Sequence, residues 1–390
     1  MLNVAIIGCG NISPAHISAY LTFPERCRIV ALVDIYPEKA EKRAKEYVPD
    51  AEVLDSHKKL LGRADIDLIS VCTPPYTHAD IACDFLLDGK NVIVEKPMAS
   101  SLAECDRIIE AQKIGGGTLS VIAQNRFRNP IMHLKQTLDA GLIGKVLHFQ
   151  VDSHWWRGHC YYDLWWRGSW EKEGGGCTLN HAVHHIDMLN WMMGLPEKVT
   201  AVMSNTAHDN AEVEDLSIAI LEYPKGTLAQ VTSSVVHHGE DQNIIIQGEK
   251  AKIMAPWEVY ASNSMANGFP KRNEELEKEI KEYCNSLPEL TYEGHVGQID
   301  NILTAIETGA EVLIKGNDGR KTVELIAAIY KAGCTRSTVT LPLVPEDDFY
   351  TVEGIRKNAI YFYQKGTSIE NFEDSSITTG SNYSEEKAAR

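Results

Sequence analysis

The sequence predicts an α/β region with a doubly wound parallel sheet at residues 1–125, followed by an α+β region with an open-faced, mostly antiparallel sheet at residues 126–345. In the first region, short continuous apolar runs alternate with helical patterns, which is typical of βαβ units. After about residue 126 the runs alternate apolar with polar residues, as in antiparallel sheets with one solvated face. The third observation is a glycine-rich turn between the first run and the first helix.

The apolar runs of the first region are rich in valine and isoleucine, which fits strands that are buried on both faces. The expected strands are Val4–Gly8, Ile29–Asp34, Leu68–Thr73, Asn91–Glu95 and Leu119–Ala123, and the expected helices between them are Ala15–Thr22, Pro37–Tyr47, His78–Leu87 and Leu102–Gln112.

The second region mixes helices with shorter alternating strands. Residues 346–390 form a C-terminal extension that is polar from about 366, where we expect a mobile tail. The expected helices are Ile131–Ala140, Asn180–Met193, Val296–Ile306 and Lys321–Lys331, and the expected strands are Val146–Asp152, Thr200–Ser204, Leu216–Tyr223, Leu228–Ser234 and Asn243–Gln247.

The composition narrows the class of protein. The 390 residues are 44% hydrophobic and 24% charged, which are ordinary globular values. A net charge of −16 repels phosphate backbones, so we expect no nucleic-acid partner. We see neither a leader peptide nor an apolar stretch long enough to span a membrane. Nine scattered cysteines without a C-x-x-C pair then predict reduced thiols and a cytoplasmic location.

The glycine turn has the features of a dinucleotide site. Gly8 permits a tight turn, and Gly10 lets the backbone approach a pyrophosphate at a helix N-terminus, although Ser13 replaces the usual third glycine. Asp34 ends the second strand, where a carboxylate accepts hydrogen bonds from ribose and repels a 2′-phosphate. This order is typical of a Rossmann domain that binds NAD; the alternative is a glycine turn beside a solvated aspartate. The expected cofactor contacts here are Gly8, Gly10, Asn11, Ile12 and Asp34.

Two further strand ends lie at the same edge of the predicted sheet. Thr73 and Pro74 follow one strand, and His78 opens the next helix, either beside the cofactor or as a surface histidine at a helix end. Glu95 and Lys96 end the following strand, where Lys96 could reach both nicotinamide and substrate. A lysine in a surface salt bridge is the alternative. We expect all five residues to contact the cofactor.

A glycine segment at 174–176 precedes a cluster of polar residues on an expected helix. Asn180 and His184 are four residues apart, so they share a helix face, and Asn180 could orient an imidazole that accepts a hydroxyl proton. His181, His184 and His185 could bind a metal. Adjacent histidines point to different faces, however, and no spaced set of carboxylates or cysteines lies nearby, so we expect no metal.

Five of the seven tryptophans lie between residues 155 and 170. Aromatic faces stack on the C–H faces of sugar rings, and arginines donate to sugar hydroxyls. A buried aromatic core or an interface between subunits would give the same composition, and both explanations can hold for different residues. The expected substrate contacts are Trp155, Arg157, Tyr162, Trp165, Trp166, Arg167 and His181.

These motifs together resemble the glucose–fructose oxidoreductase / inositol dehydrogenase / MocA family over nearly the whole chain to about Pro342. The segment from Trp155 to the glycines at 174–176 resembles the members that oxidise sugars and glycosides, including those acting at C3. The carriers are Gly8-x-Gly10, Cys72-Thr73-Pro74, Glu95-Lys96-Pro97, Gly174-Gly175-Gly176 with His184 and Asp187, and Val339-Thr340-Leu341-Pro342.

The resemblance implies a Rossmann domain, an open-faced sheet domain, NAD(P) chemistry on sugars, cyclitols or glycosides, and homo-oligomers. It implies that Lys96 is the active-site lysine and His184 the acid/base histidine. Asn180 stands where many members have aspartate, so the chain departs from the family's usual triad of lysine, aspartate and histidine.

These expectations combine into a mechanism in which His184 takes the hydroxyl proton and Lys96 stabilises the alkoxide while hydride passes to NAD. One alternative is an NAD-dependent glycosidase that oxidises C3 transiently. The other is a non-catalytic sensor of NAD or sugar, which would need neither Lys96 nor His184.

Overall fold

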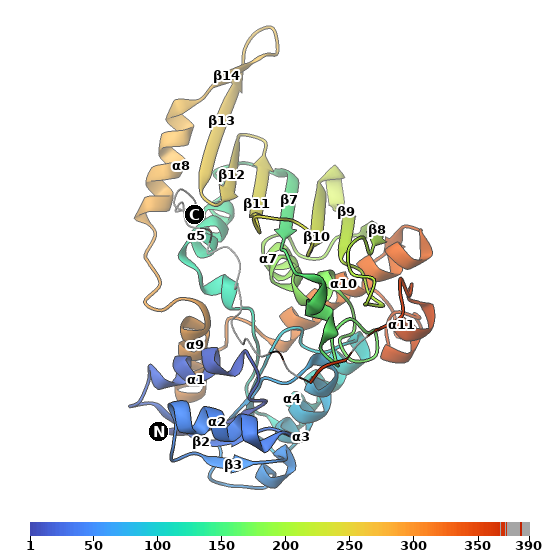
Figure 1. Cartoon of the computed structure of the whole chain (residues 1–390). Helices are drawn as coiled ribbons and strands as arrows, with labels where there is room; N and C mark the ends of the chain where they lie inside the picture. The colour runs from blue at the N-terminus through green and yellow to red at the C-terminus, as the bar shows by residue number, and fades with distance from the viewer. Residues whose placement is uncertain (367, 371, 373–382, 384–390) are drawn as a thin grey trace.

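The computed structural model describes residues 1–366, 368–370, 372 and 383, and its two sheets lie one above the other in Figure 1. The first sheet is six-stranded and parallel, and its strand order reverses between β1 and β4, which creates a crevice at the carboxyl ends of these strands. In spatial order the strands are β3 (Glu52–Leu54), β2 (Cys27–Val33), β1 (Leu2–Ile7), β4 (Leu68–Val71), β5 (Asn91–Val94) and β6 (Leu119–Val121).

Five of these strands are the predicted ones, because their side chains are apolar on both faces and helices cover both sides. The prediction missed β3, a three-residue edge strand that is only partly buried. The helices are α1 (Ser13–Leu21), α2 (Pro37–Tyr47), α3 (His78–Leu87) and α4 (Leu102–Gly115), and α9 (Gly294–Thr308), far along the chain, packs beside α1 (Figure 1).

The second sheet has nine strands and one solvated face. It is mixed rather than purely antiparallel, because β7 and β10 pair in parallel. Along β8 and β9, exposed and buried side chains alternate, which explains the period-two pattern in the sequence. In spatial order the strands are β14 (Pro270–Arg272), β13 (Glu258–Ser264), β12 (Ala251–Ala255), β11 (Gln242–Gly248), β7 (Val146–His154), β10 (Leu228–Ser234), β9 (Leu216–Glu222), β8 (Lys198–Ser204) and β15 (Val339–Thr340).

Helices cover the other face of this sheet. The predicted helix Asn180–Met193 is in fact two helices, α6 and α7, separated at His181 and Ala182. Two helices, α8 and α11, were not predicted. The remaining helices are α5 (Asn129–Asp139), α6 (Cys177–Asn180), α7 (Val183–Met193), α8 (Glu274–Ser286), α10 (Gly316–Thr335) and α11 (Val352–Asn358).

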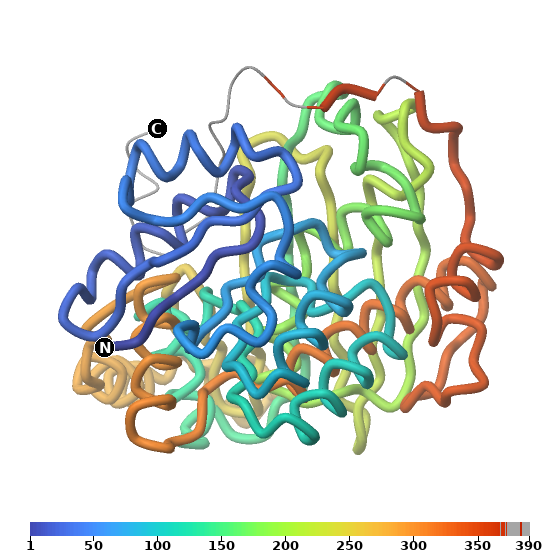
Figure 2. The backbone as a smooth tube through the Cα atoms, turned by 90° about the horizontal axis from the view of Figure 1, so that it is seen from below, coloured from blue at the N-terminus to red at the C-terminus, as the bar shows by residue number. Residues whose placement is uncertain are grey.

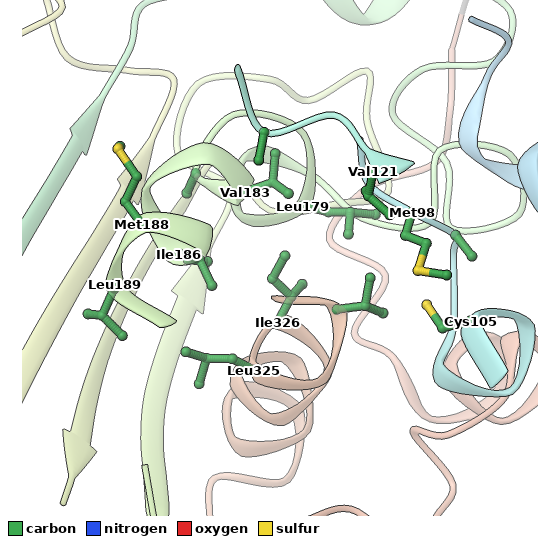
Figure 3. Close-up of a cluster of buried hydrophobic side chains, with 14 of the residues drawn as sticks. Met98, Cys105, Val121, Leu179, Val183, Ile186, Met188, Leu189, Leu325 and Ile326 are labelled. Atoms are coloured by element: carbon green, nitrogen blue, oxygen red, sulfur yellow. The ribbon is translucent and has the colours of Figure 1, made fainter. Parts of the chain in front are cut away.

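One apolar core joins the two sheets. Met98 and Val121 from the first region meet Val183 from α7 and Ile326 from α10 (Figure 3). All four side chains are nearly or fully buried. The α7 helix is therefore held from both sides, which fixes the position of the polar residues at its N-terminal end.

The C-terminal extension packs along the second region. Ile369 forms an isolated β-bridge with Leu164, through backbone hydrogen bonds of 2.8 Å to Asp163 and 2.9 Å from Trp165. Figure 2 shows this red segment beside the green one. The Tyr383 hydroxyl lies 2.5 Å from Nε2 of His185. The rest of the tail that we expect to be mobile, residues 367, 371, 373–382 and 384–390, lies outside the described residues.

Within the described part of the chain, no helix is long and apolar enough to cross a bilayer. All nine cysteines are free thiols.

Candidate active site

The glycine turn after β1 leaves room for a ligand. Gly8 has φ +94°, and a Cβ there would lie 2.6 Å from the carbonyl oxygen of Cys72, so only glycine fits. A Cβ on Gly10 would meet nothing within 4 Å. Ser13 is buried and donates its hydroxyl to the Gly10 carbonyl at 2.8 Å, which supports the turn without a third glycine. No side chain caps α1, so its N-terminus can receive a pyrophosphate, and the neighbouring Asn11 is exposed while Ile12 is partly buried.

Asp34 is fixed beside this turn. Its Oδ2 accepts the backbone N–H of Cys9 at 2.7 Å, and its Oδ1 accepts the N–H of Tyr36 at 2.9 Å. The carboxylate is therefore preoriented at the edge where a Rossmann fold holds the adenosine ribose. The turn and Asp34 together fit NAD.

The loop after β4 is supported by His78, the first residue of α3. Thr73 receives a hydrogen bond from Thr77 at 2.7 Å, next to the partly buried Pro74. His78 is fully buried, with its ring nitrogens 2.7 Å from the Thr73 carbonyl and 2.9 Å from the Pro97 carbonyl. Both alternatives for His78 are therefore corrected: it is not on the surface, and neither ring nitrogen is left for a cofactor. It supports the loop instead.

Glu95 is buried beside two histidines, of which His16 is within hydrogen-bond distance. His16 Nε2 lies 2.8 Å from Glu95 Oε1, and His295 Nε2 lies 3.7 Å from the same oxygen. Burial alone would lower the pKa of His16, but Cys72 and Glu95 raise it to about 10. Burial alone would raise the pKa of Glu95, but His16 and His295 hold it well below its usual value.

Among the described residues, this group is also the one with metal-ligand geometry, because its three ligand atoms lie within 4.8 Å of one another. The histidines at 181, 184 and 185, which the sequence indicated as possible metal ligands, do not have that geometry in the part of the chain that is described. An ion pair between protonated His16 and ionised Glu95 accounts for the group by itself. The other oxygen of Glu95 accepts the N–H of Lys96 at 3.0 Å, so the pair fixes the backbone of Lys96.

Lys96 extends from the end of β5 toward the second region. Its Nζ donates to the backbone carbonyl of Asn180 at 3.1 Å. Burial lowers the pKa of Lys96, and the charge of Glu95 opposes this change. Lys96 therefore exchanges its proton more readily than an exposed lysine does.

His184 lies at the start of α7 and lines one small cavity together with Lys96. Burial, followed by the charge of Lys96, lowers the pKa of His184 well below its usual value, so the imidazole is neutral at neutral pH and can accept a proton. Its Nδ1 is buried without a hydrogen-bond partner.

The expectation that the Asn180 side chain orients the His184 imidazole is wrong. Its side chain donates to the carbonyls of Gly175 and Gly176 at 3.2 and 3.4 Å rather than to His184. The break between α6 and α7 removes the shared helix face that the spacing suggests. Asn180 instead receives Lys96 through its backbone carbonyl.

Asp187, one turn after His184, anchors α7 to the segment that follows β6. It forms a two-pronged ion pair with Arg126, with both N–O distances at 2.7 Å, and Thr322 lies 3.3 Å from one of its oxygens. Arg126 is 2% exposed and lies over the Trp191 ring. The sequence indicated Asp187 as part of a motif, but nothing marked Arg126, which is 61 residues away.

The aromatic segment divides into buried and accessible parts. Trp155 and Tyr162 are buried and belong to the core, with Trp155 bound to Ser153 Oγ at 3.0 Å. Trp165, Trp166 and Arg167 are only partly buried. The latter three are the better candidates for contact with a ligand.

Two arginines of this segment meet at one tyrosine, Tyr161, which lies beside His181. Arg167 lies 4.2 Å over the Tyr161 ring and pairs with Glu173 at 2.9 Å. Arg157 lies 5.6 Å over the same ring and also pairs with Glu240. His181 packs against Tyr161 at 5.5 Å between ring centres, so the segment reaches the α6–α7 break.

The turn after β1 and the lysine after β5 lie at the same edge of one parallel sheet, as a dinucleotide-dependent oxidoreductase requires. A family model for oxidoreductases with an NAD-binding Rossmann fold matches residues 2–123. A second model, for the GFO/IDH/MocA C-terminal domain, matches residues 131–254. The chain therefore belongs to the GFO/IDH/MocA family of oxidoreductases, and NAD is its cofactor.

Similar proteins have several named activities. The chain is 31% identical to an inositol 2-dehydrogenase of Gluconacetobacter diazotrophicus over 65% of this chain and 74% of that one. It is 26% identical to a 2,7-anhydro-N-acetylneuraminate hydratase of Escherichia coli over 70% and 72%. The crystal structure of the WlbA dehydrogenase of Bordetella pertussis with NADH and UDP-GlcNAcA has a TM-score of 0.78, at 26% identity over 88% and 98% of the two chains.

Proposed function

We propose that the protein is an NAD-dependent dehydrogenase that moves hydride between nicotinamide and a secondary hydroxyl or ketone of a sugar, cyclitol or glycoside. The observation that carries this proposal is the approach of Lys96 to the start of α7: beyond the carboxyl end of β5, Lys96 donates to the Asn180 carbonyl at 3.1 Å, and His184 of α7 borders the same small void. The relatives named inositol 2-dehydrogenase support the substrate class.

The chemistry follows from the protonation states of the two residues. Neutral His184 takes the proton of the substrate hydroxyl, and the Lys96 ammonium donates a hydrogen bond to the developing alkoxide. Bound NAD supplies the hydride acceptor. In the reverse direction, His184 returns the proton to the reduced carbonyl oxygen.

A screen of monosaccharides, cyclitols and glycosides with NAD tests this function. NADH absorbance and the mass of the product are followed together. We expect NADH to appear with a keto product, and no turnover across the whole screen would contradict the proposal.

Asp34 is expected to set the preference for NAD over NADP. Asp34→Ala removes both the ribose acceptor and the charge that repels a 2′-phosphate. Loss of this hydrogen bond to a charged group should raise the KM of NAD roughly 10- to 100-fold. The KM of NADP should fall, because the charge that repels its 2′-phosphate is gone. Kinetics with both cofactors measure this, with the exposed Asp50→Ala as control. A wild type that prefers NADP would contradict the role of Asp34.

We propose also that the solvated face of the second sheet is a contact between copies of this chain. Val202 and Ile218 are exposed and lie opposite each other on β8 and β9. Ile220 and Leu228 continue the same apolar face. Exposed, contiguous apolar side chains of this kind are typical of interaction surfaces.

Trp165 is expected to stack on the substrate rather than to hold the subunits together. Stacking contributes enough that Trp165→Ala should raise KM for the sugar about 3- to 10-fold, with the mass from light scattering unchanged and above that of one chain. Trp257→Ala, in the hairpin between β12 and β13, is the control. A fall in mass for Trp165→Ala would place this segment at a subunit interface instead.

One relative is named a hydratase, so a reaction without net redox is a second candidate. Transient oxidation at C3 of a glycoside, elimination of the aglycone, addition of water to the resulting double bond and re-reduction at C3 would use the same Lys96 and His184. In that case the free sugar and aglycone appear without NADH.

A further inference from the structure

Glu214 is a buried carboxylate directly behind the active-site segment. It lies just before β9 and has no solvent exposure. Its Oε2 accepts the N–H of Gly176 at 3.1 Å, and its Oε1 accepts the N–H of Thr178 at 3.0 Å. Its own backbone carbonyl accepts the N–H of Cys177 at 3.2 Å. Three consecutive amides therefore point at one residue.

Tyr330 of α10 completes this arrangement. Its hydroxyl donates to Glu214 Oε1 at 3.1 Å and accepts the N–H of Leu179 at 3.2 Å. The N–H groups at the start of a helix have no partners within the helix. Glu214 and Tyr330 supply those partners for the first three residues of α6.

Gly175 and Gly176 are explained by the same two residues. A Cβ on Gly176 would lie 1.9 Å from the Glu214 carbonyl oxygen, and a Cβ on Gly175 would lie 2.1 Å from the Tyr330 hydroxyl. The segment can approach Glu214 and Tyr330 this closely only without side chains at these positions.

This segment leads directly to the catalytic lysine. Asn180 follows Thr178 by two residues, and its carbonyl receives the Lys96 ammonium at 3.1 Å. The Asn180 side chain is tied back to the Gly175 carbonyl at 3.2 Å. A shift of α6 therefore moves the acceptor of Lys96.

We propose that Glu214 is a positioning residue for this active site, whose ionised carboxylate holds α6 so that the Asn180 carbonyl orients Lys96. The proposal rests on the proposed function for its effect on turnover. Protonation of Glu214 turns an acceptor of the segment into a donor and loosens α6.

Glu214 is a group at α6 that changes charge near neutral pH. Burial raises the pKa of Glu214 to about 7, against the hydrogen bonds from Thr178 and Tyr330. The groups that face it from α6, α10 and the aromatic segment stay neutral, because burial raises the pKa of Cys177, Cys334, Tyr162 and Tyr330 above the usual values. Burial would raise the pKa of Asp215, but hydrogen bonds from His208 and nearby amides lower it, so it stays ionised.

Turnover should therefore fall as the pH drops through about 7. Protonation of His184 cannot cause this acidic limb of the pH–rate profile, since the pKa of His184 lies well below its usual value. Glu214→Gln replaces one acceptor by an amide and should lower kcat about 10- to 100-fold, as small displacements of catalytic groups do. It should also remove the limb and leave the affinity for NAD unchanged. Tyr330→Phe removes one donor from the carboxylate, so its limb should move to higher pH.

Amide hydrogen exchange of residues 174–182 gives a readout that does not depend on any substrate. Exchange should be faster in Glu214→Gln and in Tyr330→Phe than in the wild type at pH 8. Glu277→Gln is the matched control, because Glu277 is also buried and hydrogen-bonded but lies on α8 against β13. It should change neither exchange in this segment nor the limb.

The outcomes separate this proposal from the proposed function. Unchanged exchange at 174–182 in both variants overturns the role of Glu214, whether or not a sugar is turned over. Faster exchange with an unchanged pH limb overturns it as well. Faster exchange together with the loss of the limb in Glu214→Gln supports it.

If Glu214→Gln does not fold, Tyr330→Phe decides: faster exchange with a limb moved to higher pH supports the proposal, and an unmoved limb overturns it. If no sugar is turned over, the proposed function fails and exchange alone decides whether Glu214 holds α6.

Discussion

Replacing Lys96 by alanine is expected to lower kcat by about 10²- to 10⁴-fold, and His184→Ala should have an effect of the same order. Lys96→Ala removes the cation next to the alkoxide, and His184→Ala removes the proton acceptor. NAD should bind both variants normally, because the glycine turn and Asp34 lie elsewhere on the sheet edge. Steady-state kinetics and NADH fluorescence measure the two effects separately.

Lys90→Ala is the control for this experiment. Lys90 precedes β5, whereas Lys96 follows it, so the two lysines lie at opposite ends of one strand. Lys90 donates to the Arg63 carbonyl at 2.7 Å and should leave kcat unchanged. Near-normal turnover in either active-site variant removes that residue from the mechanism.

Arg126→Met is expected to destabilise the protein by about 3–5 kcal/mol, because it leaves the charge of Asp187 buried without its partner. The pair is 2% and 7% exposed in its side chains, so water cannot compensate. Urea unfolding of the variant should show a lower midpoint. Turnover should fall too, since Asp187 holds the helix that carries His184.

Two further variants test this explanation. Arg126→Met combined with Asp187→Leu removes both charges, and buried pairs replaced by apolar residues are often neutral in stability. The double variant should therefore recover most of the loss. Arg107→Met breaks an exposed pair with Asp80 and should cost at most about 1 kcal/mol. A double variant that is no more stable than the single one would contradict the account.

Five strands of the first sheet were predictable because they carry continuous apolar runs, whereas the short edge strand β3 does not. The glycine turn was predictable because one backbone geometry requires it. The helix α8 was missed although Asn273 caps it and acidic residues fill its first turn, since few of its side chains are buried. The strands β13 and β14 carry many exposed side chains, so they give little apolar signal.

The candidate site was predictable only where a motif marks it. Lys96, His184 and Asp34 stand in local patterns, but Glu214 and Arg126 act through contacts across 36 to 116 residues. No local pattern records such contacts. The expected pairing of Asn180 with His184 failed for the same reason: Glu214 and Tyr330 hold α6 as a separate short helix, so a spacing of four residues no longer means a shared face.

The fate of the hydrogen on the reacting carbon tests the central claim most directly. A sugar or glycoside that is turned over is prepared with deuterium at its carbon positions and incubated with wild-type enzyme and excess NAD. Mass spectrometry then follows the cofactor and the sugar. Hydride transfer predicts reduced cofactor that carries deuterium, in amounts equal to the keto product. Release of an aglycone while the cofactor stays oxidised and free of deuterium would contradict a net dehydrogenase.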